Sequence, residues 1–173
     1  MKRSEKGLRT TLNRKGTRSD NSPILVRKSA RIKQPAICER CGAIYADKTW
    51  RNDRRAAAAL LDKANWITCP ACSQARGGVY FGRVLASGPG LAGRHDAIER
   101  RIANIARLAS SRQPERKLES VEWSGPKLEV LTTSQKLAHR IARELAKTFG
   151  GKAVYRWSDD DGSLLATWNC PAR

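Results

Sequence analysis

The chain has 173 residues, with 34 Lys or Arg against 16 Asp or Glu, which gives a formal net charge of +18. This length suits one compact domain with small attachments, and no apolar run is long enough to cross a membrane. Such an excess of positive charge favours a polyanion as the partner, and in the first place a nucleic acid.

Residues 1–34 are expected to be a disordered basic tail, because Lys, Arg and small polar residues dominate and apolar residues are few. Residues 1–37 carry 11 Lys or Arg and only two acids. We interpret the tail as an arm that becomes ordered on nucleic acid rather than as a merely solvating segment, because its charge is dense and a cysteine-rich segment follows it. A transit peptide is the third interpretation, and the lack of a clear amphipathic face disfavours it. Its candidate contacts are Arg27, Lys28, Arg31 and Lys33.

Residues 35–78 contain two closely spaced cysteine pairs, Cys38 with Cys41 and Cys69 with Cys72. Two residues between paired thiols allow one turn of backbone to offer both sulfur atoms to a single ion. Four thiolates are the ligand set of a structural zinc site, so the sequence predicts a zinc-ribbon-like module that binds Zn²⁺ through these four residues.

Other uses of the cysteines fit less well. A thioredoxin-type pair requires one such motif beside a βαβ unit, and a disulfide framework is typical of short secreted chains. A catalytic zinc keeps one position open, which four thiolates would close. Cys170, near the C-terminus, is expected to be a free thiol, and this cysteine usage favours a reducing, cytoplasmic location.

The segment between the pairs has helical character around residues 56–61, with Asn52 or Asp53 as the cap. The two cysteine turns are therefore expected to be joined through a helix rather than a bare hairpin. Trp50 and Trp66 flank this helix and are expected to fill the core around the metal. Three cations of the segment are candidate nucleic-acid contacts: Arg51, Arg54 and Arg55.

Residues 79–173 predict an α+β domain. The expected elements, in chain order, are strand 79–86, helix 94–111, strand 117–123, strand 127–133, a helix from Ser134 to Gly150, strand 152–157 and strand 164–168. This is the ferredoxin-like β-α-β-β-α-β order with one strand added by a hairpin. In that fold both helices cover one face of an antiparallel sheet.

The helix over residues 134–149 has two contrasting faces. Apolar residues share one side, and the opposite side carries cations at spacings of three and four, where like charges repel. A ridge that contacts phosphates and an ordinary solvated face both explain this pattern. The candidate contacts are Lys136, Arg140, Arg143 and Lys147, and His139 lies among them.

The last two strands contain Tyr155, Trp157 and Trp168. These aromatic residues either stack on bases or pack in the protein, and we favour packing because the preceding strand lacks the aromatic signature of an RNA-recognition sheet. His95 and His139 are expected to be plain surface groups. No nucleophile–base pair and no phosphate loop is present, so the chain is not expected to be an enzyme, and no small-molecule substrate is evident.

The cysteine pairs, the stretch GGVYFGR at 77–83, LTTSQKLA at 131–138 and FGG at 149–151 together carry a family likeness. Over residues 36–169 the chain resembles the nonsense-mediated-decay-three family, the export adaptor of the large ribosomal subunit, and its short prokaryotic relatives. The resemblance implies association with the ribosome or its RNA. The family generally carries more zinc-ligand cysteines than this chain, and nuclear export is not implied.

These observations predict a non-enzymatic, zinc-binding protein that binds RNA, with the ribosome as the expected partner. The alternative is a DNA-binding transcription regulator built on the same zinc module, because charge alone does not separate RNA from DNA. An enzyme using the ferredoxin-like domain would need an open metal position or converging acids, and the sequence offers neither.

Overall fold

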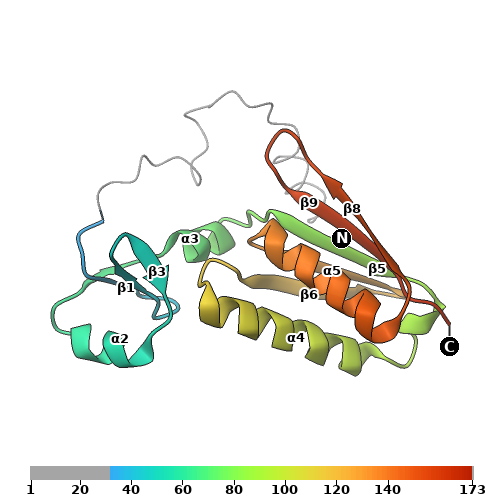
Figure 1. Cartoon of the computed structure of the whole chain (residues 1–173), viewed down its shortest axis with the longest axis horizontal. Helices are drawn as coiled ribbons and strands as arrows, with labels where there is room; N and C mark the ends of the chain where they lie inside the picture. Colours follow the sequence, from blue (N-terminus) through green and yellow to red (C-terminus); the bar gives the residue numbers. More distant parts are fainter. Residues whose placement is uncertain (1–31, 173) are drawn as a thin grey trace.

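The computed structural model describes residues 32–172 (Figure 1). In this part of the chain, two β-sheets and four α-helices form a mixed α+β structure. A four-stranded sheet with two short helices, here called the cysteine module, comes first. A five-stranded sheet with two long helices follows, and the two sheets lie side by side.

The cysteine module contains a hairpin and a parallel strand pair. Its elements are β1 (Ala36–Cys38), β2 (Ile44–Ala46), β3 (Thr49–Arg51), α2 (Arg54–Leu60), β4 (Asn65–Ile67) and α3 (Pro70–Arg76). The strand order is β3-β2-β1-β4, with β4 parallel to β1 and the other pairs antiparallel. Because parallel strands end at the same edge, the residues after β1 and after β4 are brought together.

Helix α2 confirms the predicted helix between the cysteine pairs. Asp53 caps it, since its side chain accepts hydrogen bonds from the backbone N–H groups of Arg55 and Ala56. The hairpin of β2 and β3 was not expected from the sequence. Trp50, in β3, packs against the cysteines as expected, whereas the same expectation for Trp66 is wrong. Trp66 lies on the edge strand β4 and stays 53% exposed, because that strand has a neighbour on one side only.

The elements of the second part follow the predicted chain order. They are β5 (Gly82–Ser87), a 3₁₀ turn η1 (Pro89–Leu91), α4 (His95–Arg112), β6 (Leu118–Ser124), β7 (Lys127–Thr132), α5 (Gln135–Phe149), β8 (Lys152–Trp157) and β9 (Leu164–Asn169). Ser134 is the N-cap residue of α5, and Gly150 ends that helix with a positive φ of 83°.

The position of β9 in the sheet differs from the expectation. The strand order is β6-β7-β5-β9-β8, so β9 lies between β5 and β8 and runs parallel to β5. The sheet is therefore mixed, whereas the sequence predicts an antiparallel one. Burial explains the exchange: Leu164, Ala166 and Trp168 of β9 are buried, while β8 carries exposed Lys152 and Arg156 and tolerates the edge.

Helices α4 and α5 lie on the same face of the five-stranded sheet (Figure 1). The apolar sides of both helices face the core, with Ile98, Ile102 and Ile105 from α4 and Leu137, Ile141 and Leu145 from α5 all buried. Polar contacts fasten this layer. Arg101 of α4 donates to Glu144 of α5 at 2.7 Å, and His95 stacks on Trp123 of β6 at 3.9 Å between ring centroids. His95 is thus exposed, as the sequence predicts, but it has an aromatic partner.

Two side chains of the cysteine module reach backbone carbonyls of the second part. Asn52 donates to the carbonyl of Ser110 at the end of α4, and Gln74 of α3 donates to the carbonyl of Thr133 at 2.8 Å. These hydrogen bonds hold the module beside the end of α4 and the β6–β7 side of the sheet. None of the helices within residues 32–172 has the length and apolar character needed to cross a bilayer.

Candidate metal centre and nucleic-acid interface

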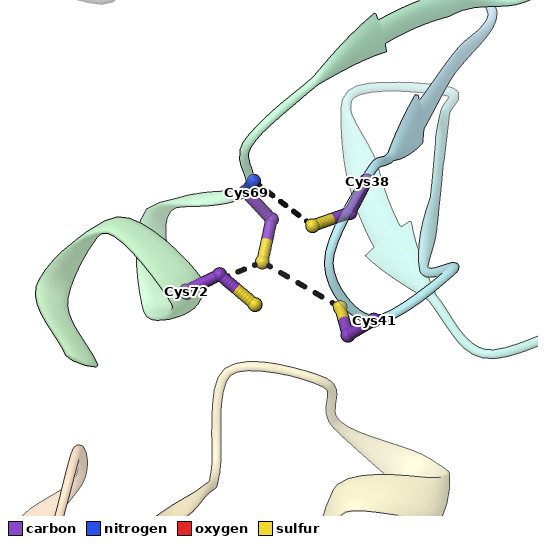
Figure 2. A group of neighbouring side chains, drawn as sticks. All are labelled: Cys38, Cys41, Cys69 and Cys72. Atoms are coloured by element: carbon purple, nitrogen blue, oxygen red, sulfur yellow. Dashed lines mark hydrogen bonds between the residues drawn. The ribbon is translucent and has the colours of Figure 1, made fainter. Parts of the chain in front are cut away.

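The four predicted metal ligands converge on one point. Figure 2 shows the side chains of Cys38, Cys41, Cys69 and Cys72 pointing toward one another, the first two from the end of β1 and the turn that follows it, and the others from the start of α3. Their Sγ atoms all lie within 4.8 Å of one another. Across residues 32–172 this is the one group of His, Cys, Asp and Glu side chains that could hold a metal ion.

The first cysteine turn is a tight loop that closes on itself. The N–H of Gly42 donates to the carbonyl of Cys38, and the N–H of Cys38 donates to the carbonyl of Ala43, each at 2.8 Å. Gly42 has a φ of 70°, a left-handed conformation that glycine adopts without strain. The loop thereby returns Cys41 to the side on which Cys38 lies.

The second cysteine turn is the first turn of α3. Cys69 is the N-cap residue, and its Sγ accepts a hydrogen bond from the N–H of Cys72 at 3.4 Å. Pro70 follows at the first helical position, where its fixed φ suits a helix and its missing N–H has no helical acceptor. The N–H of Cys69 also donates to Sγ of Cys38 at 3.2 Å, which joins the two turns.

The surroundings of Cys38, Cys69 and Cys72 give these thiols different pKa values. Burial raises the pKa of Cys38, but hydrogen bonds from the N–H groups of Cys69, Cys41 and Arg40 outweigh it and lower the pKa to about 7. Burial raises the pKa of Cys69, and the neighbouring thiolate charges raise it further. Burial also raises the pKa of Cys72. The thiolate of Cys38 thus forms readily, while Cys69 and Cys72 require a cation to replace their protons.

Lys117 supplies a positive charge beside the cluster. It lies just before β6, and its Nζ donates to Sγ of Cys72 at 2.7 Å. Burial acts to lower the pKa of Lys117, but the hydrogen bond to Cys72 and the charges of Cys41 and Cys69 outweigh it and raise the pKa. The ammonium group therefore stays charged next to the thiolates. Sequence reasoning missed Lys117, and a lone lysine 45 residues from its partner carries no local signal.

Cys170 lies apart from this centre. It is fully buried in the core of the five-stranded sheet layer, where burial raises its pKa and the charge of Arg94 opposes the rise. The expectation that Cys170 is a free thiol rather than a ligand agrees with this position.

The four predicted cations of α5 lie together on its outer face. Lys136, Arg143 and Lys147 are exposed and Arg140 is half-buried, while the opposite face of the helix is buried. Arg143 lies 3.7 Å from Glu144, whose other oxygen holds Arg101. Within the described residues, no carboxylate forms an ion pair with Lys136, Arg140 or Lys147, so three charges of this ridge are not neutralised.

The remaining predicted contacts lie elsewhere. Arg54 and Arg55 are exposed in the first turn of α2, a helix end where cations are electrostatically unfavourable. Arg51 is exposed but pairs with Asp47 at 2.6 Å, which partly neutralises it, and Lys33 is exposed near the start of the described chain. Arg27, Lys28 and Arg31 lie outside the described residues.

The three aromatic residues of the last hairpin have different environments. Trp168 is buried, and its Nε1 donates to the carbonyl of Gly150 at 2.9 Å. Tyr155 is partly buried against His139 of α5, at 4.5 Å between ring centroids. Trp157 remains 52% exposed. Trp168 therefore packs in the core and Tyr155 packs partly against it, whereas Trp157 lies at the surface of the sheet near His139.

Comparisons with protein-family models, with curated proteins and with solved structures gave no match to this chain. The likeness to the nonsense-mediated-decay-three family stays a prediction from the sequence.

Proposed function

We propose that this protein is a non-enzymatic, zinc-stabilised RNA-binding protein whose target is the ribosome or ribosomal RNA. The metal part of the proposal is supported by the thiol geometry. With Zn–S bonds of about 2.3 Å, sulfur atoms at the corners of a tetrahedron lie about 3.8 Å apart. The Sγ atoms of Cys41 and Cys69 are separated by 3.8 Å. Four thiolates would close the coordination sphere, so the ion would stabilise the fold rather than catalyse a reaction.

Zinc would supply most of the stability of the cysteine module. Its three-residue strands and seven-residue helices bury few large side chains, and the cysteines themselves make up much of its interior. Such small modules commonly fold only with the metal bound, because ion binding offsets the entropy of ordering the chain. We further propose that the module is a zinc ribbon, and that β5 to β8 are a ferredoxin-like unit in which β9 has displaced β8 to the edge.

The RNA part of the proposal is carried by the basic ridge of α5. A helix that served only to cover the core would gain stability from acids interleaved with its cations. The outer face of α5 instead repeats positive charge along its length, with Glu144 as its one acid, and Glu144 is engaged by Arg101. Phosphates are the ligands that such a ridge would neutralise, and the net charge of +18 favours the same class of partner. The ribosomal target is supported by the family likeness alone.

The test is competition between ribosomal RNA and duplex DNA for the full chain, combined with ribosome co-sedimentation across a salt series. The proposal expects ribosomal RNA to displace duplex DNA, and co-sedimentation to decline steeply as salt rises, because phosphate contacts release counterions. Preferential binding of the DNA duplex would favour a DNA-binding regulator instead. Co-sedimentation that is absent at low salt would overturn the ribosomal target.

A further inference from the structure

Trp157 is a large aromatic residue that the fold leaves half in water. It is the last residue of the edge strand β8, and 52% of its surface is exposed. Its cross-strand partner is Leu164, which is buried under the helices, so Trp157 projects from the same face of the sheet on which α5 lies. The indole is therefore presented beside α5 rather than on the opposite face of the sheet.

His139 extends this aromatic surface onto the helix. Its ring centroid lies 4.5 Å from that of Tyr155 and 6.2 Å from that of Trp157, with interplanar angles of 35° and 30°. Tyr155 and Trp157 are two residues apart in β8 and share a face of that strand. The three rings form one continuous cluster, of which Trp157 is the exposed member.

Cations of α5 border this cluster. Lys136 precedes His139 by three residues and Arg143 follows it by four, spacings that place all three side chains on the same side of the helix. Both cations are exposed. The charge of Arg143 acts on Tyr155, whose pKa is raised by burial and held back by this charge. The rings and the cations therefore belong to one surface.

We propose that this surface, formed by Trp157, His139 and Tyr155 with Lys136 and Arg143, binds an unpaired segment of RNA. The proposal rests on the RNA-binding function and names the form of RNA that the site takes. A base stacks on the exposed indole of Trp157, while Lys136 and Arg143 contact the adjoining phosphates. Aromatic platforms bordered by cations bind single strands because the bases of a duplex are already stacked on one another.

The experiment measures binding of the full chain to a fluorescent single-stranded oligouridine RNA of about 12 nucleotides, a length within the range that one binding fold covers, and to an RNA duplex. Trp157→Ala is expected to weaken single-strand binding about tenfold while changing duplex binding little. Trp157→Phe should retain most of the affinity, since a phenyl ring still stacks. Circular dichroism and thermal melting establish that each variant is folded.

Trp66 provides a matched control, since it is exposed to the same degree on another edge strand and contacts no other ring among the described residues. Trp66→Ala should bind the single strand like the wild-type chain. An equal loss in Trp66→Ala and Trp157→Ala, or equal single-strand affinity of Trp157→Ala and the wild type, would overturn the inference.

The same data separate this inference from the proposed function. A wild-type chain that binds the duplex but not the single strand would contradict the stacking surface and leave RNA binding intact. A wild-type chain that binds neither RNA would contradict both.

Discussion

The Nζ atom of Lys117 lies 2.7 Å from the Sγ atom of Cys72, and this contact joins the five-stranded sheet to the candidate metal centre. The two residues are 45 positions apart, with Cys72 in α3 and Lys117 just before β6. A tetrathiolate zinc site carries a net negative charge, which the ammonium group partly compensates. The positive charge beside the four thiols therefore depends on where the cysteine module lies relative to the five-stranded sheet.

Replacing Lys117 by methionine keeps the length of the side chain and removes its charge. Hydrogen bonds to charged groups contribute about 1.5–3 kcal/mol, so we expect Lys117→Met to lower the free energy of unfolding by an amount in that range. The substitution should also speed the transfer of zinc to a chromophoric chelator, because the charge that compensates the thiolates is removed. Lys127→Met is the control, because Lys127 is an exposed lysine of the adjacent strand β7. Equal zinc-transfer rates in the two variants would contradict the role of Lys117.

Removing one metal ligand should remove the ion. The wild-type chain is expected to contain about one zinc ion per molecule by elemental analysis, whereas Cys69→Ser should lose it and unfold the cysteine module. Cys170→Ser is the matched control, since this cysteine is buried in the other core. It should keep its zinc, and a Cys69→Ser protein with full zinc content would argue against the four-thiolate site.

Zinc affinity should rise with pH. Because burial raises the pKa of Cys69 and of Cys72, both thiols are protonated in the metal-free protein near neutral pH, and zinc must displace these protons. The metal-free state holds more protons than the metal-bound state, so acid disfavours binding and base favours it. Cys38, with a pKa lowered to about 7, contributes a fraction of a proton at pH 7.

Proton release measures this linkage directly. Titration of zinc into weakly buffered, metal-free protein at pH 7 should release at least about two protons per ion, from Cys69 and Cys72, and a fraction of a proton from Cys38. Release of no protons would show that the thiols are already ionised without the metal.

Neutralising the α5 ridge should change the salt dependence of RNA binding. Each phosphate contact contributes about 0.7 to the slope of log K against log salt for single strands. The triple variant Lys136→Gln, Arg140→Gln, Lys147→Gln is expected to reduce the slope by about 2 units and to weaken binding at low salt. A matching triple substitution at Arg51, Arg54 and Arg55 tests whether the cysteine module contacts phosphates. In that module Arg51 is already paired with Asp47. An unchanged slope in the α5 variant would exclude the ridge as a phosphate contact.

The interior of the helical layer gives a test of the fold. Ile102 of α4 is fully buried, so Ile102→Ala should destabilise the protein by about 2–5 kcal/mol through lost burial and the cavity left behind. Leu108 lies on the same helix but is 41% exposed, and Leu108→Ala should cost much less. Urea denaturation of both variants compares them. Similar losses of unfolding free energy in the two variants would contradict the burial of Ile102 and the exposure of Leu108.

Local sequence signals were sufficient for most individual elements. The apolar spacing of α4 and α5, the cap at Asp53 and the glycines after α5 depend on residues near one another in the chain, and each predicted element is found close to its expected place. The four cysteines of the candidate metal centre were equally predictable, because two residues between paired cysteines is a local geometric requirement.

Relationships between distant segments could not be read in this way. Three features depend on which strand has a neighbour on each side. They are the exchange of β8 and β9, the exposure of Trp66 and Trp157, and the contact of His139 with Tyr155. By itself the sequence determined the basic charge, the helices and strands after residue 79, and the four thiols. Only the tertiary structure decided that Lys117 lies beside the four thiols and that Trp157 faces water beside α5, because both depend on the packing of segments far apart in the chain.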